Sequence, residues 1–189
     1  AFLCSFRSHG AIYFNKTISI ISLYKGVLLM FAKFMKKNKV QVFSPLSGQV
    51  IPLEQVPDPV FSQKMMGEGV AIMPTGGDVV APIDGTVVLI SKTKHAIGIR
   101  TKDDTEVLIH VGLETVTLKG EGFTVFVNEG DVVSTGQKLM TVDWDFIKDK
   151  VPSIITPVVI TNSAERTVDY TDASASVAGD TLVMSVSSK

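Results

Sequence analysis

The chain has 189 residues, 45% of them hydrophobic, which fits one globular domain of about 150 residues plus an appendage. The formal net charge of −1 hides an asymmetry, because seven of the 18 Lys and Arg residues but none of the 19 acidic residues precede Val40. The remainder carries 11 basic and 19 acidic residues, a net charge of −8 that argues against nucleic-acid binding. Cys4 is the only cysteine, which excludes a disulfide framework and is compatible with a reducing compartment.

Residues 1–39 read as a basic, apolar tail ahead of one domain, residues 40–189. Lys16, Lys25 and Lys33 divide the apolar residues 11–35, so no uncharged stretch reaches the roughly 18 residues that span a bilayer. Three interpretations stay open: an amphipathic helix on a membrane surface, a targeting peptide, or non-native sequence ahead of a true start at Met30. A start at Met30 would leave residues 30–39 as a short amphipathic segment that touches anionic membranes.

From Val40 onward, short runs of Val, Ile and Leu alternate with turn residues, which predicts strands throughout. The expected strands are Val40–Phe43, Gln49–Ile51, Val70–Met73, Asp78–Ala81, Gly85–Ser91, His95–Thr101, Val107–Val111, Thr115–Leu118, Thr124–Val127, Lys138–Asp143, Val158–Thr161, Thr167–Tyr170 and Leu182–Val186. A helix is expected at Asp145–Val151, with Asp143 as N-cap and Pro152 after it, and a further helical turn at Ser62–Met66. The fold class is therefore all-β: an antiparallel β-sandwich or barrel-sandwich with one or two short helices.

Two histidines, His95 and His110, lie on neighbouring strand segments joined by Asp103-Asp104. A two-residue turn there would place His110 opposite Ile97 and bring both imidazoles to one face, within side-chain reach. A three-residue turn would shift the register by one and put the rings on opposite faces. The alternative to a pair is two isolated strand histidines, each satisfied by a neighbouring backbone group.

An imidazole pair is suited to carrying a phosphoryl group or to binding a metal ion. A neutral imidazole is a nucleophile near pH 7, and a second imidazole can donate to the charged phosphoryl oxygens. Thr93, two residues before His95, is placed to fix the tautomer of that ring. A zinc peptidase is possible in principle but needs a third protein ligand that the spacing does not identify. The phosphate-binding loop of nucleotide-dependent kinases and the serine-hydrolase elbow are absent.

Residues 40–189 resemble the IIA domain of the glucose family in the bacterial phosphoenolpyruvate-dependent sugar phosphotransferase system. The matching segments are Ser44–Gly48, Val56–Phe61, Gly67–Ile72, Pro74–Gly76, Ala81–Thr86, Thr93–Ala96, Leu108–Val116, Leu118–Phe123 and Thr156–Ile160. They follow the family's order over essentially the whole domain, whereas residues 1–29 show no counterpart.

The resemblance implies a β-sandwich phosphocarrier in which His110 accepts the phosphoryl group, His95 stabilises it and Thr93 orients His95. It implies that the group comes from the phosphocarrier protein HPr and passes to the IIB domain of a sugar permease, at the cytoplasmic face of the membrane. No cofactor is required, although a regulatory zinc ion could be shared between His95, His110 and a partner. The apolar docking ring that the resemblance implies comprises Val60, Phe61, Met65, Met66, Ile97, Leu108, Val111 and Val116.

Three positions depart from enteric members of the family: Ser91 and Val111 replace phenylalanine, and Gln63 replaces an acidic residue. These departures leave the expected chemistry unchanged. The set of partners known for enteric members is therefore not assumed for this chain. Two alternatives remain, a zinc-binding hydrolase on a related β-sandwich and a non-catalytic regulatory binding module. The sugar is not indicated, because selectivity belongs to the membrane partner.

Overall fold

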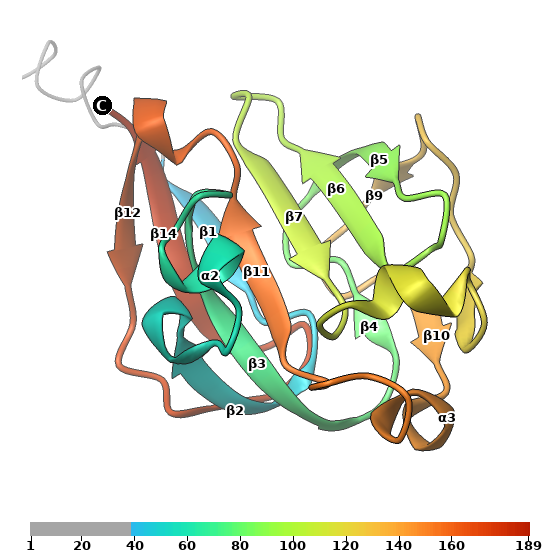
Figure 1. The fold of residues 1–189 in the computed structure, drawn as a ribbon. Coiled ribbons are helices and arrows are strands. Elements are labelled where there is room, and N and C mark those ends of the chain that lie inside the picture. Colours follow the sequence, from blue (N-terminus) through green and yellow to red (C-terminus); the bar gives the residue numbers. More distant parts are fainter. Residues whose placement is uncertain (1–38) are drawn as a thin grey trace, which may run out of the picture. The chain divides into compact units, whose positions relative to one another are not determined.

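Short antiparallel strands make up most of the regular secondary structure of residues 39–189, the part of the chain that this computed structural model describes (Figure 1). The strands are β1 (Val40–Phe43), β2 (Ser47–Pro52), β3 (Glu68–Gly76), β4 (Val79–Val80), β5 (Gly85–Ile90), β6 (Ala96–Arg100), β7 (Glu106–His110), β8 (Phe123–Val125), β9 (Val132–Val133), β10 (Lys138–Val142), β11 (Thr156–Ile160), β12 (Arg166–Tyr170), β13 (Ala175–Ser176) and β14 (Leu182–Ser188). The helices are α2 (Pro59–Ser62) and α3 (Trp144–Lys148), with 3₁₀ turns η1 (Leu53–Gln55), η2 (Thr115–Leu118) and η3 (Ser163–Glu165). The expected all-β class is confirmed, and the expected tail lies outside the described residues except for Lys39.

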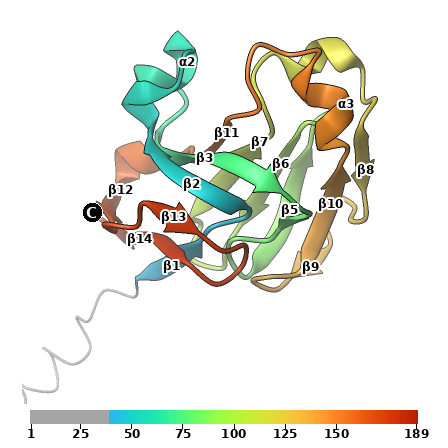
Figure 2. The ribbon, with the colours of Figure 1, turned by 90° about the horizontal axis from the view of Figure 1, so that it is seen from below.

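The described strands form three antiparallel sheets. The largest sheet has the order β13-β2-β3-β11-β7-β6-β5-β9, and two smaller sheets have the orders β1-β14-β12 and β4-β10-β8. Figure 2 shows α2 on the opposite side of β2 and β3 from β1 and β14. The large sheet is therefore covered on both faces near its centre, where β3, β11 and β7 lie side by side.

Two apolar clusters occupy the two faces of the large sheet, and the strand pleat divides residues between them. On β7, Val107 and Ile109 belong to the main core, whereas Leu108 belongs to the second cluster. β6, β11 and β3 alternate in the same way. Since His110 is two residues after Leu108 on the same strand, its side chain lies on the face of the second cluster.

The second cluster is covered by residues 53–66, which contain η1 and α2. α2 begins at Pro59 because a carboxylate oxygen of Asp58 accepts a hydrogen bond from Val60 N at 2.8 Å and Pro suits the first helical position. The helical turn expected at Ser62–Met66 is therefore wrong in its bounds, since the Asp-Pro start signal lies three residues earlier than the prediction. Phe61, the buried residue of α2, packs into the second cluster.

The other differences from prediction are local. Thr115–Leu118 is the 3₁₀ turn η2 instead of a strand, because left-handed residues at Glu114 (φ 56°) and Lys119 (φ 53°) bend the chain at both ends. α3 is capped by the Asp143 side chain as expected but ends at Lys148, three residues before the predicted end. The two-residue strands β9 and β13 were not predicted, because runs this short carry no periodic signal.

Candidate functional site

His110 closes β7 and is held in one tautomer by the backbone. Its Nδ1 lies 2.8 Å from the carbonyl oxygen of Gly112. A carbonyl oxygen only accepts hydrogen bonds, so Nδ1 carries the proton and the lone pair of the neutral ring is on Nε2. Gly112 has φ +69°, a left-handed conformation that turns its carbonyl back toward the preceding histidine. The local turn therefore leaves Nε2 as the nucleophilic atom.

His95 lies in the turn between β5 and β6, just before β6 begins at Ala96. The β6–β7 ladder pairs Ala96 with His110, so the predicted pairing of His110 with Ile97 is wrong by one residue. The connection is longer than a two-residue turn: residues 101–105 lie between the strands, closed by a hydrogen bond from Thr101 N to Thr105 O.

The rings still meet, because His95 is outside the regular strand. Lys94 before it is left-handed (φ 59°), which breaks the strict alternation of strand side chains that would have sent the two rings to opposite faces. The ring centroids of His95 and His110 are 4.7 Å apart, at an interplanar angle of 71°. The expectation of a paired imidazole site is confirmed, although by a different register. The pair lies where the end of β7 and the start of β6 meet.

Phe61 forms the apolar wall beside the pair. Its ring centroid is 5.2 Å from that of His110, at an interplanar angle of 60°, a favourable edge arrangement. Phe61 is buried, and burying such a ring stabilises the fold by about 1.5–3 kcal/mol. Residues 53–66 therefore stabilise the second cluster and also keep water from one side of His110.

Two hydroxyl groups lie against Nδ1 of His95. Thr93 Oγ1 is 2.6 Å from it and Ser91 Oγ is 3.2 Å from it. The expectation that Thr93 reaches this ring is met, although from a turn instead of a strand face. If one of these hydroxyls donates to Nδ1, the ring proton is on Nε2.

Burial keeps both imidazoles neutral near pH 7. Desolvation, followed by the neighbouring His110, lowers the pKa of His95 to about 4. Desolvation also lowers the pKa of His110, but hydrogen bonding to the Gly112 backbone and the negative charge of Asp58 oppose it. A neutral His110 retains the lone pair that a nucleophile needs.

The residues expected to form a docking ring divide into two groups. Val60 (39% exposed), Met65 (70%), Met66 (39%) and Val116 (55%) present apolar side chains at the surface. Phe61 and Leu108 are buried beneath them in the second cluster.

The prediction that Ile97 and Val111 contact a partner is wrong, because both are 0% exposed. Because strand side chains alternate between faces, the side chain of Ile97 points into the main core. Val111 belongs to the same core cluster.

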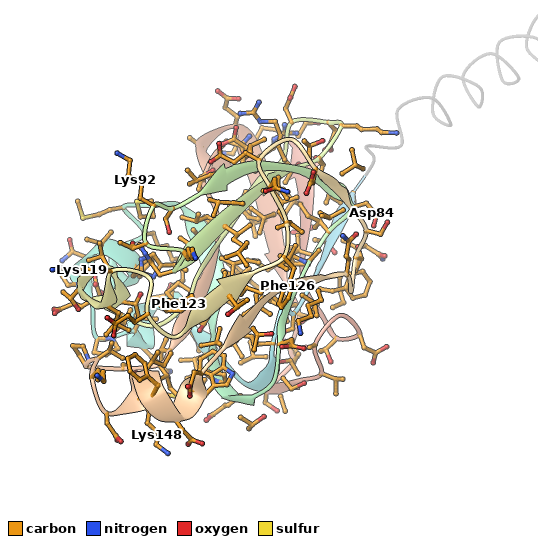
Figure 3. The ribbon with its side chains drawn as sticks, turned by 90° about the vertical axis from the view of Figure 1, so that its right-hand side faces the viewer. Asp84, Lys92, Lys119, Phe123, Phe126 and Lys148 are labelled. Carbon is orange, nitrogen blue, oxygen red and sulfur yellow. The ribbon has the colours of Figure 1, made fainter. Side chains whose placement is uncertain are left out.

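Three lysines lie on the two turns next to the pair. Lys92 and Lys94 are in the turn that carries His95, and Lys119 ends η2. The two turns are in contact, since a Cβ at Gly120 would lie 3.9 Å from Lys94 Cδ. Figure 3 shows Lys92 and Lys119 along the same edge of the molecule. Such an edge favours approach of an anionic group.

Sequence reasoning did not assign site roles to Asp58, Gly112 or Ser91. Asp58 has two roles. It is the N-cap of α2, and its negative charge opposes the lowering of the His110 pKa by burial. The sequence Asp58-Pro59 predicts the start of the helix. It does not predict that Asp58 lies near His110, which is 52 positions further along the chain. Gly112 acts through its carbonyl oxygen and Ser91 through its hydroxyl oxygen. The position of each oxygen depends on a backbone turn that the sequence pattern does not show.

Neither a metal centre nor a membrane span is evident in residues 39–189. That part of the chain has no group of three or more His, Cys, Asp or Glu side chains placed to bind a metal ion. Within the same range, no helix is both long and apolar enough to cross a bilayer. The zinc ion that the resemblance implies stays a prediction.

A β-sandwich that holds two imidazoles edge to face beside the buried Phe61 fits a histidine phosphocarrier. The family model of the phosphoenolpyruvate-dependent sugar phosphotransferase system, EIIA 1, matches residues 40–166. The chain belongs to this family and is a phosphoryl-carrying phosphotransferase component of that system.

Named relatives of this family are similar to this chain over most of its length. A glucose-specific EIIA component of Bacillus cereus is 50% identical over 161 residues, which cover 85% of this chain and 98% of the relative. A glucose-specific EIICBA component of Staphylococcus carnosus is 49% identical over 143 residues, which cover 76% of this chain and 21% of that longer protein. The solved structure of glucose permease IIA from Mycoplasma capricolum matches with a TM-score of 0.74 and 40% identity, over 78% of this chain and 96% of that one.

Proposed function

We propose that His110 accepts the phosphoryl group through Nε2, from HPr, and passes it to the IIB domain of a sugar permease. The single observation that carries the proposal is the bond from His110 Nδ1 to Gly112 O, which leaves Nε2 unprotonated beside a second imidazole. As the Nε2–P bond forms, the donor's P–N bond breaks and the donor imidazole leaves with its electron pair. Nδ1 of His110 keeps its proton against the carbonyl throughout.

His95 stabilises the phosphoryl group in this proposal, and Thr93 orients His95. With Thr93 Oγ1 donating to Nδ1, the proton on Nε2 of His95 can be donated to a phosphoryl oxygen. The apolar walls slow hydrolysis of the labile P–N bond by limiting water. Positioning and hydrogen-bond donation are what phosphoryl transfer chiefly requires.

The proposed docking surface for both partners is the exposed set Val60, Met65, Met66 and Val116, with Phe61 and Leu108 beneath it. Both partners dock from the cytoplasmic side of the membrane. The EIICBA relative joins a matching segment to further components in one polypeptide, which supports IIB as the acceptor. The names of the relatives make glucose the first sugar to test.

Two further parts of the proposal concern zinc and the membrane. Zinc is not required for transfer; a regulatory ion could bind His95 and His110 only with ligands from a partner, since two imidazoles leave a tetrahedral site incomplete. Treatment with a chelator should therefore leave phosphate acceptance unchanged, whereas a zinc hydrolase would lose its activity. The peripheral membrane contact assigned to residues 30–39 lies outside the described residues, and flotation of the full chain with anionic vesicles tests it.

The test of function is phosphotransfer with purified components. The full chain is incubated with phosphoenolpyruvate, enzyme I and HPr, and acid-labile phosphate is mapped by peptide. His110→Ala should accept none, while His95→Gln should accept phosphate but pass it to IIB poorly. Equal loss of acceptance in both variants would contradict this division of roles, and an unphosphorylated wild type would favour the non-catalytic binding module.

A further inference from the structure

Nδ1 of His95 faces two hydroxyl groups, although an imidazole nitrogen has only one proton or one lone pair to share. Thr93 Oγ1 is the nearer, at 2.6 Å, and Ser91 Oγ is at 3.2 Å. Both distances are within hydrogen-bonding range. The proposed function uses Thr93 alone, which leaves Ser91 unexplained.

The other bonds of Ser91 fix the position of its hydroxyl oxygen. Ser91 Oγ accepts a hydrogen bond from Ala96 N at 3.0 Å, so one of its lone pairs is occupied. Its backbone closes the same turn through Ser91 N to Ala96 O (2.9 Å) and Lys94 N to Ser91 O (2.8 Å). The oxygen is thus held at the base of the turn that carries His95, within reach of Nδ1. The hydroxyl donates to Nδ1 when the ring proton is on Nε2.

The two hydroxyls differ in how firmly they are held. Thr93 Oγ1 has Nδ1 as its recorded partner, so rotation about its Cα–Cβ bond would remove the contact. Ser91 Oγ is anchored by the Ala96 amide and cannot turn away without losing that bond. Thr93 therefore makes the shorter contact with Nδ1, whereas Ser91 is the hydroxyl that is held in place.

We propose that Ser91 is a second positioning residue for His95: its hydroxyl donates to Nδ1 in place of Thr93 and so keeps the ring proton on Nε2 when the Thr93 contact is absent. The inference rests on the proposed function and deepens it, since it concerns the group that donates to the phosphoryl oxygens. It also gives a role to a serine at a position where enteric relatives carry phenylalanine.

A double-mutant cycle on the full chain tests the proposal. The variants are Thr93→Val, Ser91→Ala and the double variant, with Ser91→Thr to restore a hydroxyl. Two quantities are measured: the ¹⁵N shifts of the His95 ring, which report its tautomer, and the rate of transfer to IIB. Thr141→Val is the matched control, because its hydroxyl bonds Asp78 in the sheet of β4 and β10, outside the histidine site.

Each single variant should slow transfer by about two- to tenfold, the range expected for loss of one neutral hydrogen bond. The double variant should lose more than the product of the two single effects and show a mixed tautomer, because the remaining hydroxyl compensates in each single variant. Ser91→Thr should behave as wild type, and Thr141→Val should change neither quantity.

Two results would overturn the proposal. One is a wild-type ring with its proton on Nδ1. The other is an effect of Ser91→Ala that is the same size with Thr or Val at position 93, since the serine would then act only through the turn. Phosphate acceptance by His110 in the wild type is scored separately, so failure of the proposed function is distinguishable from failure of this inference.

Discussion

Gly112 accepts a hydrogen bond from Nδ1 of His110 at 2.8 Å while its own backbone is left-handed, with φ +69°. One residue thus supplies the acceptor that sets the tautomer and the turn that aims it. A Cβ at this position would lie 2.7 Å from Thr115 Cγ2 and 3.3 Å from Ser153 O. The tautomer of His110 therefore depends on a position where only glycine fits without strain.

Gly112→Ala should destabilise the fold by about 1–3 kcal/mol and reduce phosphate acceptance more than tenfold, because relief of the clash moves the carbonyl away from Nδ1. Urea denaturation and transfer from phospho-HPr measure the two effects. Gly130→Ala is the matched control: Gly130 is also left-handed (φ +95°), but nothing lies within 4 Å of its added Cβ. Unchanged acceptance in Gly112→Ala would show that the carbonyl does not set the tautomer.

Protonation of His95 should cost stability as the pH falls. Its pKa is about 4 in the fold against 6.5 for an unperturbed histidine, so below pH 6.5 the unfolded chain binds more protons and the folded state is disfavoured down to about pH 4. His95→Gln should therefore flatten the decline in melting temperature between pH 6.5 and 4. The carboxylates titrate in both proteins and cancel in the comparison. Parallel declines for wild type and variant would contradict the lowered pKa.

The charge of Asp58 should be separable from its helix cap. Asp58→Asn keeps a capping side chain for α2 but removes the negative charge, so the pKa of His110 should fall further. Asp58→Ala removes both and should also cost about 1 kcal/mol of stability. NMR titration of His110 and urea denaturation separate the two. A His110 pKa that is the same in Asp58→Asn and wild type would exclude the electrostatic role.

The exposed apolar residues should govern partner affinity without affecting chemistry. Met65→Lys and Val116→Lys should each raise the KM for phospho-HPr about tenfold or more, because a charge enters the centre of an apolar contact. Val132→Lys is the control, since Val132 is 78% exposed on β9 at the edge of the large sheet. Equal effects at positions 132 and 116 would refute a localised docking surface.

Much of this fold is legible in the sequence, because strands buried on one or both faces leave runs of Val and Ile between turn residues. β1 is predicted with its observed bounds, and the other strands of four or more residues are predicted to within a few residues. Two of the failures, at η2 and at the turn before β6, share one physical cause. Left-handed residues such as Glu114 and Lys94 redirect the chain without any change in hydrophobic pattern.

The site shows the same division between pattern and geometry. The resemblance points to His95, His110 and Thr93, and these three lie together. The strand register does not follow from Asp103-Asp104, because the loop spans residues 101–105. Ile97 and Val111 are buried because their side chains lie on the face of the large sheet that forms the main core. Their apolar character alone does not show on which face of the sheet they lie.

The position of the phosphoryl group on the ring tests the central claim most directly. Phosphorylated full-length chain with ¹⁵N-labelled histidine is examined for ³¹P–¹⁵N coupling. The account predicts phosphorus bonded to Nε2 of His110, with a proton retained on Nδ1 against Gly112 O. Phosphorus on Nδ1 of His110, or on either nitrogen of His95, would contradict it.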